Sequence, residues 1–152
     1  MGRVQLAINV NDIDEAVAFY SKLFDTEPAK RRPGYANFAV DEPPLKLVLL
    51  ENPGQGGSIN HLGVEMADVD AVDATQTRLA ADGLATTDER DTVCCYAKQD
   101  KFWVQGAPDG EQWEVYTVLE DSPTFYAGGD GEAACCATDA EASHGASAAA
   151  CC

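Results

Sequence analysis

Cysteine occurs in this chain only as adjacent pairs. The pairs are Cys94 with Cys95, Cys135 with Cys136, and Cys151 with Cys152. Neighbouring cysteines rarely form a disulfide with each other, because the small ring would distort the peptide bond between them. Two adjacent thiolates can instead bind one soft acceptor such as trivalent arsenic, cadmium, zinc or copper(I). The alternative explanation, burial of small side chains, gives no reason for repeated pairing, so the pattern predicts capture of a thiophilic atom.

Three further side chains, Gln5, His61 and Glu114, could hold a metal ion. Gln5 and His61 occupy equivalent positions in an internal repeat, and Glu114 lies on the last predicted strand, so all three are expected to face one cleft. One imidazole, one carboxylate and one amide oxygen suit Fe(II), Mn(II), Ni(II) or Zn(II). Each residue alone has an ordinary structural explanation, so the prediction depends on their shared position.

The predicted metal site has three protein ligands rather than four. Residues 45–48, on the final strand of the first repeat, read Leu-Lys-Leu-Val and offer no His, Glu, Asp or Gln. On the last strand of the second repeat, two-residue alternation places Tyr116 and Val118 on the same face as Glu114. A site with three ligands leaves coordination positions open for a substrate or for oxygen.

The elements that must position these residues occur twice. Residues 4–14 align with residues 60–70, a constant offset of 56 positions (60 minus 4). The identical pairs are Leu6 and Leu62, Asp12 and Asp68, Asp14 and Asp70, and Leu23 and Leu79. Each copy begins with an alternating strand and continues with an aspartate suited to cap a helix. The predicted helices run from Ile13 to Phe24 and from Val69 to Asp82.

Each predicted helix is followed by one short strand and two longer ones. These strands are Thr26-Glu27, Tyr35 to Val40 and Leu45 to Leu50 in the first copy, and Thr86-Thr87, Tyr96 to Val104 and Gln112 to Leu119 in the second. On the first helix, an apolar face is predicted from Ala16, Phe19, Tyr20 and Leu23. The fold class is therefore α+β, with two tandem βαβββ modules, at about 1–52 and 57–120, that enclose a metal-binding cleft.

Length and composition suit one globular domain. With 152 residues and 45% hydrophobic content, the chain can bury a core without disulfides. Its net charge of -16, from 10 basic and 26 acidic residues, argues against nucleic acid or an anionic membrane surface as a partner. No secretory signal pattern or membrane-length apolar run is visible, so a cytoplasmic location with reduced thiols is expected.

Residues 121–152 are expected to form a flexible tail on a domain built from residues 1–120. No Lys or Arg follows Leu119, and the segment is acidic and rich in alanine and cysteine. Such a composition supplies no periodic apolar face for packing. Phe125 and Tyr126 could attach the first tail residues to the domain.

The duplicated βαβββ pattern and the metal-ligand triad resemble the vicinal oxygen chelate superfamily, which includes glyoxalase I and the extradiol dioxygenases. Within it, residues 18–24, 32–38, 60–64 and 94–104 closely resemble the bacterial organoarsenical carbon-arsenic lyases. Cadmium-induced proteins of the same superfamily share much of this sequence. The resemblance covers nearly all of residues 3–125.

This resemblance implies an enzyme that uses Fe(II) and dioxygen to cleave the carbon-arsenic bond of trivalent methyl or aromatic arsenicals to arsenite, for arsenic detoxification. It implies Gln5, His61 and Glu114 as the iron ligands and Cys94 with Cys95 as the arsenic-binding pair. Two thiolates can replace both exchangeable oxygen ligands of the arsenical while its carbon group faces the metal. Such positioning accounts for a large part of many rate enhancements.

The pair Cys94 and Cys95 is expected on a loop or bend. Consecutive side chains on a regular strand point to opposite faces and could not both reach one arsenic atom. The preceding polar residues 88–92 predict a mobile loop that collects substrate outside and carries it to the metal. Three nearby cations are candidates for lowering the thiol pKa values, or else are solvated charges. They are Arg90, Lys98 and Lys101.

The remaining cysteines have less certain roles. Cys135, Cys136, Cys151 and Cys152 could deliver arsenic, bind product or scavenge other soft metals. The family resemblance gives them no catalytic role.

Two other functions remain open at this point. One is a cadmium- or arsenite-binding sequestration protein, which would not need Gln5, His61 and Glu114 in a common cleft. The other is a glyoxalase-like metalloenzyme, which would not need the pair Cys94 and Cys95 and would normally show a fourth metal ligand. A lyase acting on a small organoarsenical accounts for both sets of residues.

Overall fold

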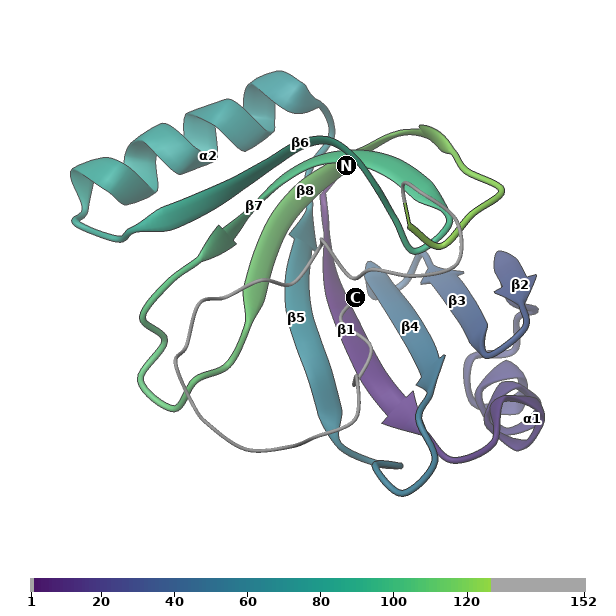
Figure 1. The fold of residues 1–152 in the computed structure, drawn as a ribbon. Helices are drawn as coiled ribbons and strands as arrows, with labels where there is room; N and C mark the ends of the chain where they lie inside the picture. The colour runs from purple at the N-terminus through teal and green to yellow at the C-terminus, as the bar shows by residue number, and fades with distance from the viewer. Residues whose placement is uncertain (1, 127–152) are drawn as a thin grey trace.

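The two copies of the repeat form two βαβββ modules that share one eight-stranded sheet (Figure 1). The computed structural model describes residues 2–126. The first module contains β1 (Arg3–Val10), α1 (Ile13–Phe24), β2 (Lys30–Arg32), β3 (Tyr35–Val40) and β4 (Leu45–Glu51). The second contains β5 (Ile59–Glu65), α2 (Val69–Ala81), β6 (Thr86–Cys94), β7 (Ala97–Val104) and β8 (Trp113–Asp121). The predicted fold class and the duplicated βαβββ order are therefore confirmed.

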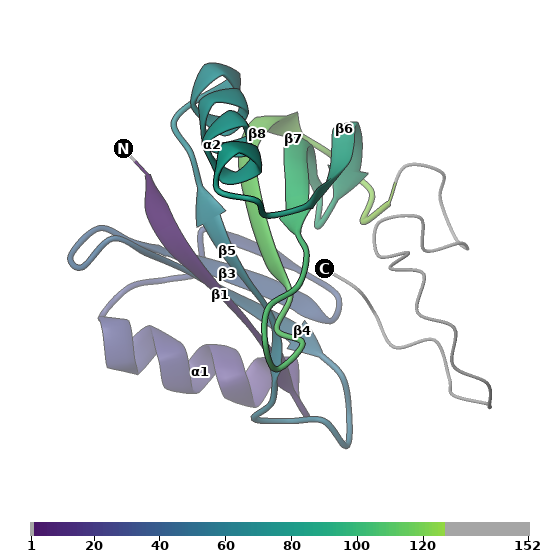
Figure 2. The same ribbon diagram turned by 90° about the vertical axis from the view of Figure 1, so that its left-hand side faces the viewer.

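The strand order is symmetric about the centre of the sheet. It runs β2-β3-β4-β1-β5-β8-β7-β6, so the second half repeats the first in mirror order. Strands β1 and β5 pair antiparallel at the centre, while β1 with β4 and β5 with β8 pair parallel. The sheet is strongly curved and carries both helices on its outer side (Figure 2). Its inner face is left for the functional side chains.

Both helices begin at the predicted aspartate caps. The side chain of Asp12 accepts a hydrogen bond from the Glu15 amide at 2.9 Å, and Asp68 accepts one from the Ala71 amide at 2.8 Å. Each cap satisfies an amide that the first helical turn leaves without a partner. Because the caps are repeat-equivalent, both modules start their helices at the same point after the first strand.

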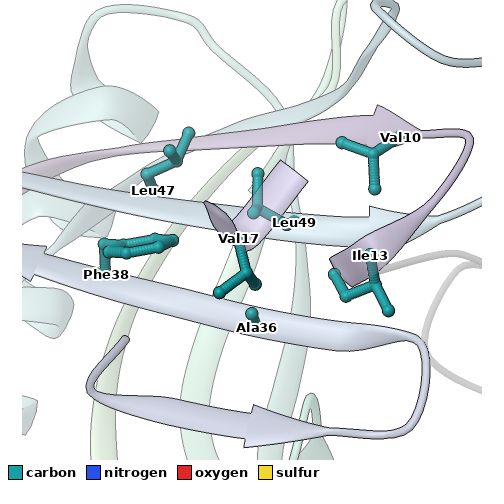
Figure 3. Packing of buried hydrophobic residues seen from close by; sticks show 7 residues of the cluster. All are labelled: Val10, Ile13, Val17, Ala36, Phe38, Leu47 and Leu49. Carbon is teal, nitrogen blue, oxygen red and sulfur yellow. The ribbon is translucent and has the colours of Figure 1, made fainter. Parts of the chain in front are cut away.

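Helix α1 packs on the sheet through a dense apolar cluster (Figure 3). Its buried members are Val10, Ile13, Val17, Ala36, Phe38, Leu47 and Leu49. The predicted apolar face is partly wrong, because Phe19 and Leu23 are 60% and 58% exposed. Ile13 and Val17 face the sheet instead, since their four-residue spacing also lies along one side of a helix.

Two strands differ from the sequence prediction. The short strand predicted at Thr26-Glu27 is β2, at Lys30–Arg32, and the polar residues 88–92 lie within β6 rather than in a loop. Both β2 and β6 are edge strands of the sheet. Edge strands commonly carry charged side chains, so a polar sequence does not distinguish them from loops.

The chain continues along the second module after β8. The amide of Ser122 donates to the carbonyl of Tyr96 at 2.9 Å, and Tyr126 forms an isolated bridge with Cys94. The Phe125 ring lies edge-on to Tyr96 at 5.3 Å. The cysteines at 135, 136, 151 and 152 lie outside the described residues. Between residues 2 and 126, no helix is long and apolar enough to cross a membrane.

Candidate functional site

Gln5, His61 and Glu114 meet on the inner face of three adjacent strands. They lie on β1, β5 and β8, and each is at most 4% exposed. The Gln5 Nε2 atom lies 3.0 Å from His61 Nε2 and donates to Glu114 Oε1 at 2.7 Å. The distance from His61 Nε2 to Glu114 Oε1, which completes the triangle of the three atoms, is 3.4 Å. The three side chains selected from the sequence are therefore brought together at one point.

Their spacing suits one divalent transition-metal ion once the Gln5 amide has turned over. The Gln5 atom in the triangle is Nε2, which does not bind metals, and turning the amide would put Oε1 in its place. Ligand atoms bound at about 2.1 Å and at right angles to one another lie about 3 Å apart. The three edges of the triad, 2.7, 3.0 and 3.4 Å, bracket that value. Within residues 2–126, no group of three or more His, Cys, Asp and Glu side chains is arranged to hold a metal. At this site the third donor would be the amide oxygen of Gln5, Oε1.

Gly63 makes the close approach of Gln5 and Glu114 possible. It lies between them in register, paired with Gln5 on one side and Glu114 on the other. A Cβ atom at Gly63 would stand 3.1 Å from Glu114 Cγ and 3.3 Å from Gln5 Cβ. A side chain there would press on both and shift them by a few tenths of an ångström, so glycine favours the observed spacing of the triad.

Val48 occupies the place of a fourth ligand. Leu6 on β1 pairs with Leu47 on β4, and Leu62, the repeat equivalent of Leu6, pairs with Trp113 on β8. Leu47 and Trp113 are therefore equivalent, and so are the residues that follow them along each strand. Val48 is thus the counterpart of Glu114. It is 2% exposed and lines the same cavity. Its side chain offers no ligand atom, which leaves three protein donors.

Hydrogen bonds orient the His61 ring. Its Nδ1 atom lies 2.8 Å from the side-chain oxygen of Asn60. Asn60 in turn donates to Asn9 Oδ1 at 3.0 Å. This arrangement places the proton of a neutral imidazole on Nδ1, so the lone pair of Nε2 points toward Gln5 and Glu114. The Trp103 ring lies edge-to-face against His61 at 5.7 Å and restricts its rotation.

Lys101 keeps Glu114 ionised. Its Nζ atom is fully buried and lies 3.1 Å from Glu114 Oε2 and 3.4 Å from Glu89 Oε2. Burial alone would raise the pKa of Glu114, but Lys101 and His61 outweigh it and hold that pKa well below its usual range. Conversely, burial would lower the pKa of Lys101, and the two carboxylates raise it above its ordinary value. With Oε2 held by Lys101, Oε1 is the Glu114 atom that faces the triad.

Tyr116 fixes the far end of the Gln5 amide. Its hydroxyl lies 2.5 Å from Gln5 Oε1 and 3.0 Å from Glu65 Oε2. Burial would raise the pKa of Glu65, but Lys46 and Arg3 lower it more, so the pKa is below its ordinary value. An ionised Glu65 can accept the single Tyr116 proton. The Tyr116 oxygen could then accept a hydrogen bond from the Gln5 NH₂ group if the amide turned over.

The cysteine pair lies at a tight turn, as the sequence predicted. Strand β6 ends at Cys94, which pairs with Ala97, and the turn residues Cys95 and Tyr96 have φ values of 54° and 60°. Positive φ at both positions is typical of a type I′ hairpin turn and costs a non-glycine residue about 1 kcal/mol. The turn brings the Cys94 and Cys95 sulfurs to 3.4 Å. That distance exceeds the roughly 2.05 Å of a disulfide, so the two are not bonded to each other.

One cavity connects Cys95 with the triad. It measures about 200 Å³, and Cys95, Gln5, His61 and Glu114 all line it. Other lining residues include Tyr35, Asn37, Val48, Ala97 and Gln99. Cys94 is 1% exposed and is disulfide-bonded in the structure. Both sulfurs can therefore act together only after Cys94 has been reduced.

Of the three candidate cations, only Lys101 belongs to the site. Arg90 pairs with Asp73 at 2.8 Å and with Asp88 at 3.2 Å. Lys98 pairs with Asp91 at 2.8 Å. The carboxylates that pair with these two cations do not line the cavity. Lys101 pairs with Glu114, as described above, and charge on Cys95 is a smaller contribution that raises its pKa.

Several residues at the site were not identified from the sequence. They are Asn60, Gly63, Gln99, Trp103 and the pairing of Lys101 with Glu114. Two-residue alternation along β7 would have placed Gln99, Lys101 and Trp103 on one face. Which face points inward depends on the pairing of β7 with β8, which only the structure supplies.

A family model described as the Glyoxalase/Bleomycin resistance protein/Dioxygenase superfamily matches residues 2–115. The chain belongs to this superfamily. Among relatives, the cadmium-induced protein CadI of Mycobacterium tuberculosis is 60% identical over 142 residues, covering 90% of this chain and 93% of the relative. A trivalent organoarsenical cleaving enzyme of Thermomonospora curvata is 53% identical over 153 residues and covers both chains completely. Another enzyme of that name, from a Bacillus species, is 39% identical and covers 82% of this chain and 80% of the relative.

Solved structures of the superfamily confirm the fold. A Mn(II)-bound glyoxalase from Novosphingobium aromaticivorans matches with a TM-score of 0.54 at 21% identity, over 80% of this chain and 42% of that one. An extradiol ring-cleaving dioxygenase from B. fuscum matches with a TM-score of 0.52 at 17% identity, over 79% of this chain and 32% of that one. Identities this low establish the shared fold alone.

Proposed function

We propose that this protein cleaves the carbon-arsenic bond of trivalent organoarsenicals and releases inorganic arsenite, as an arsenic-detoxifying enzyme of the cytoplasm. The observation that carries the proposal is the single cavity lined by Cys95 and by the triad of Gln5, His61 and Glu114. The relatives named trivalent organoarsenical cleaving enzymes support it. The partner is a small molecule, and the charge of -16 argues against nucleic acid.

The cysteine pair would bind the substrate through ligand exchange. A trivalent organoarsenical carries one organic group and two hydroxyls. The reduced thiols of Cys94 and Cys95 would replace both hydroxyls, forming two As–S bonds and releasing two water molecules. The organic group is then the only remaining substituent, and the shared cavity directs it toward the triad. Holding the reacting bond there converts an encounter in solution into an intramolecular step.

Gln5, His61 and Glu114 would hold a divalent metal, which we propose to be Fe(II) with dioxygen as co-substrate. A mixed nitrogen and oxygen donor set with open positions is typical of non-haem iron oxygenases, and bound Fe(II) would supply activation of dioxygen. For a methyl substrate, methylarsenite plus dioxygen balances as arsenous acid plus formaldehyde. Carbon is oxidised and oxygen reduced, while arsenic stays trivalent.

The surrounding residues would prepare the three ligands. Asn60 keeps the His61 Nε2 lone pair toward the ion, and Lys101 keeps Glu114 anionic while occupying its second oxygen. Tyr116, by donating to Glu65, can accept from the Gln5 NH₂ group and so turn the amide oxygen toward the ion. Partners of this kind raise ligand affinity by fixing orientation before the metal arrives.

Sequestration of cadmium or arsenite is the second candidate function. The similarity to a cadmium-induced protein and the cysteine pair favour it. Sequestration gives no role to the buried triad beside Cys95. A glyoxalase-like reaction is less well supported, because Val48 stands where a fourth ligand would be expected.

Arsenic speciation after anaerobic reconstitution tests the proposal. The reduced protein is loaded with Fe(II), given methylarsenite, and then exposed to oxygen. We expect arsenite only when iron and oxygen are both present, and we expect none from His61→Ala or Cys95→Ala. Tight binding of arsenic with no arsenite formed would overturn the lyase proposal in favour of sequestration.

A further inference from the structure

Gln99 lines the cavity and carries a buried side-chain carbonyl oxygen that has no hydrogen-bond partner among the described residues. The residue lies on β7, is 4% exposed, and lines the cavity together with Cys95 and the triad. In the described part of the chain, its Oε1 atom accepts no hydrogen bond. A buried acceptor left unsatisfied costs about 1–3 kcal/mol, so such a group usually has a ligand or water as its partner.

The orientation of the Gln99 amide is determined by its neighbour. Its Nε2 atom lies 3.5 Å from the carbonyl oxygen of Cys94. Turning the amide over would bring two carbonyl oxygens together, which is repulsive. The NH₂ group therefore faces the backbone of the cysteine turn, and the oxygen is left for a hydrogen-bond donor.

The cavity has room for an aromatic substituent. Its volume of about 200 Å³ exceeds the roughly 150 Å³ of an engineered cavity that binds benzene. Tyr35, Val48 and Ala97 form an apolar part of its wall, beside polar and charged residues such as Asn37 and Lys46. A substituted phenyl group on an arsenic atom held by Cys95 would therefore find apolar contacts, with Gln99 among the polar residues around it.

We propose that Gln99 determines specificity by accepting a hydrogen bond from a hydroxyl or amino group on the ring of an aromatic organoarsenical. This inference rests on the proposed function and names a preferred substrate class for it. The arsenic-bound hydroxyls cannot be the donors, because the two cysteines displace them. A donor supplied by the bound substrate must therefore belong to the organic group.

Competition binding to the reduced, metal-free protein tests this proposal without turnover. Hydroxyphenylarsenite is competed against fluorophenylarsenite, since fluorine is of similar size and donates no hydrogen bond. The ortho, meta and para isomers are compared separately. We expect the hydroxyl compound to bind about fivefold to tenfold more tightly for at least one isomer, the value of one net hydrogen bond. Equal binding for all three isomers would overturn the proposal.

Two substitutions separate recognition of the ring from support of the cysteine turn. Gln99→Glu keeps an acceptor oxygen but loses the donor to Cys94, whereas Gln99→Met loses both. We expect the preference for the hydroxyl compound to persist in Q99E and to disappear in Q99M. A preference that survives in Q99M, or that is lost equally in both, would contradict the proposal. Speciation with phenylarsenite reports separately on the lyase function, so the failure of either claim can be recognised.

Discussion

The two modules share a topology but differ in what they bury. In the first module, the inner-face positions that correspond to Lys101 and Glu114 are occupied by Tyr35 and Val48. The register shows this equivalence, because Tyr35 lies opposite Leu50 on β4 as Lys101 lies opposite Tyr116 on β8. One module therefore has an aromatic and an aliphatic side chain where the other has a buried ion pair.

The apolar cores between the helices and the sheet also differ, and here the first module has the larger one. Seven buried apolar residues pack around α1, whereas the corresponding cluster under α2 has three, Val72, Phe102 and Val115. Buried charges and positive φ values both destabilise a fold. The second module contains the ion pair and the strained turn at Cys95, while the first has the larger core. The comparison indicates that duplication allows one copy to stabilise the fold while the other accommodates chemistry.

Loss of the Lys101 charge should have the largest effect. Lys101→Met leaves Glu114 buried without its counter-ion, which should cost about 3–5 kcal/mol of unfolding free energy in the metal-free protein. Tyr35→Phe, at the equivalent position, removes only the hydrogen bond from Asn37 and should cost about 1 kcal/mol. Urea denaturation measures both. Equal costs would mean that the buried ion pair does not distinguish the modules.

Removal of repeat-equivalent ligands should have unequal effects on metal affinity. We expect His61→Ala to weaken Co(II) binding about 100-fold or more and Gln5→Ala to weaken it about tenfold, because imidazole is a better donor than a neutral amide. Titration followed by the visible absorption of Co(II) measures both affinities. A larger loss in Q5A than in H61A would reverse the assigned importance of the modules.

The hydroxyl of Tyr116 should matter for the metal but little for the fold. Tyr116→Phe removes the group that orients Gln5, so Co(II) affinity should fall about tenfold and the Co(II) absorption spectrum should change. Tyr20→Phe, on α1 and outside the cavity, is the matched control. Unchanged affinity in Y116F would show that the Gln5 amide needs no such partner.

Removal of the Glu65 carboxylate, which forms ion pairs between the modules, should have the smallest effect on stability, and the effect should be visible at acid pH. Glu65 on β5 pairs with Arg3 and Lys46 of the first module. Since its pKa is lowered on folding, Glu65 stabilises the fold above its ordinary value of 4.5, and this contribution is lost as pH falls through the lower folded value. Stability of the wild type should therefore fall more steeply below pH 4.5 than that of Glu65→Gln. The exposed Glu111→Gln should follow the wild type.

The sequence was sufficient to predict the first strand and the helix start of each module, because these segments repeat at a constant spacing. The caps Asp12 and Asp68 and the strand positions of Gln5 and His61 share one offset of 56 residues. On the last strands of the two modules, β4 and β8, equivalent positions such as Val48 and Glu114 are 66 residues apart. The second module is thus ten residues longer (66 minus 56), and alignment by sequence no longer pairs the last strands correctly.

The buried ion pair could not be predicted because burial of Lys101 depends on strand pairing. From the sequence, Lys101 could equally be a solvated charge, and only its place opposite Tyr116 on the inner face puts it against Glu114. The mobile loop predicted at residues 88–92 failed for a related reason. Its polar composition suits an edge strand equally well, and hydrogen bonding to β7 determines the outcome.

The most direct test of the account is a crystal structure of the reduced protein with Co(II) and phenylarsenite, in which anomalous scattering locates the cobalt and arsenic atoms independently. We expect arsenic bound to the sulfurs of Cys94 and Cys95, cobalt bound by Gln5, His61 and Glu114, and the phenyl group between them in one cavity. Arsenic held with its phenyl group directed to solvent, or cobalt bound elsewhere, would contradict the account.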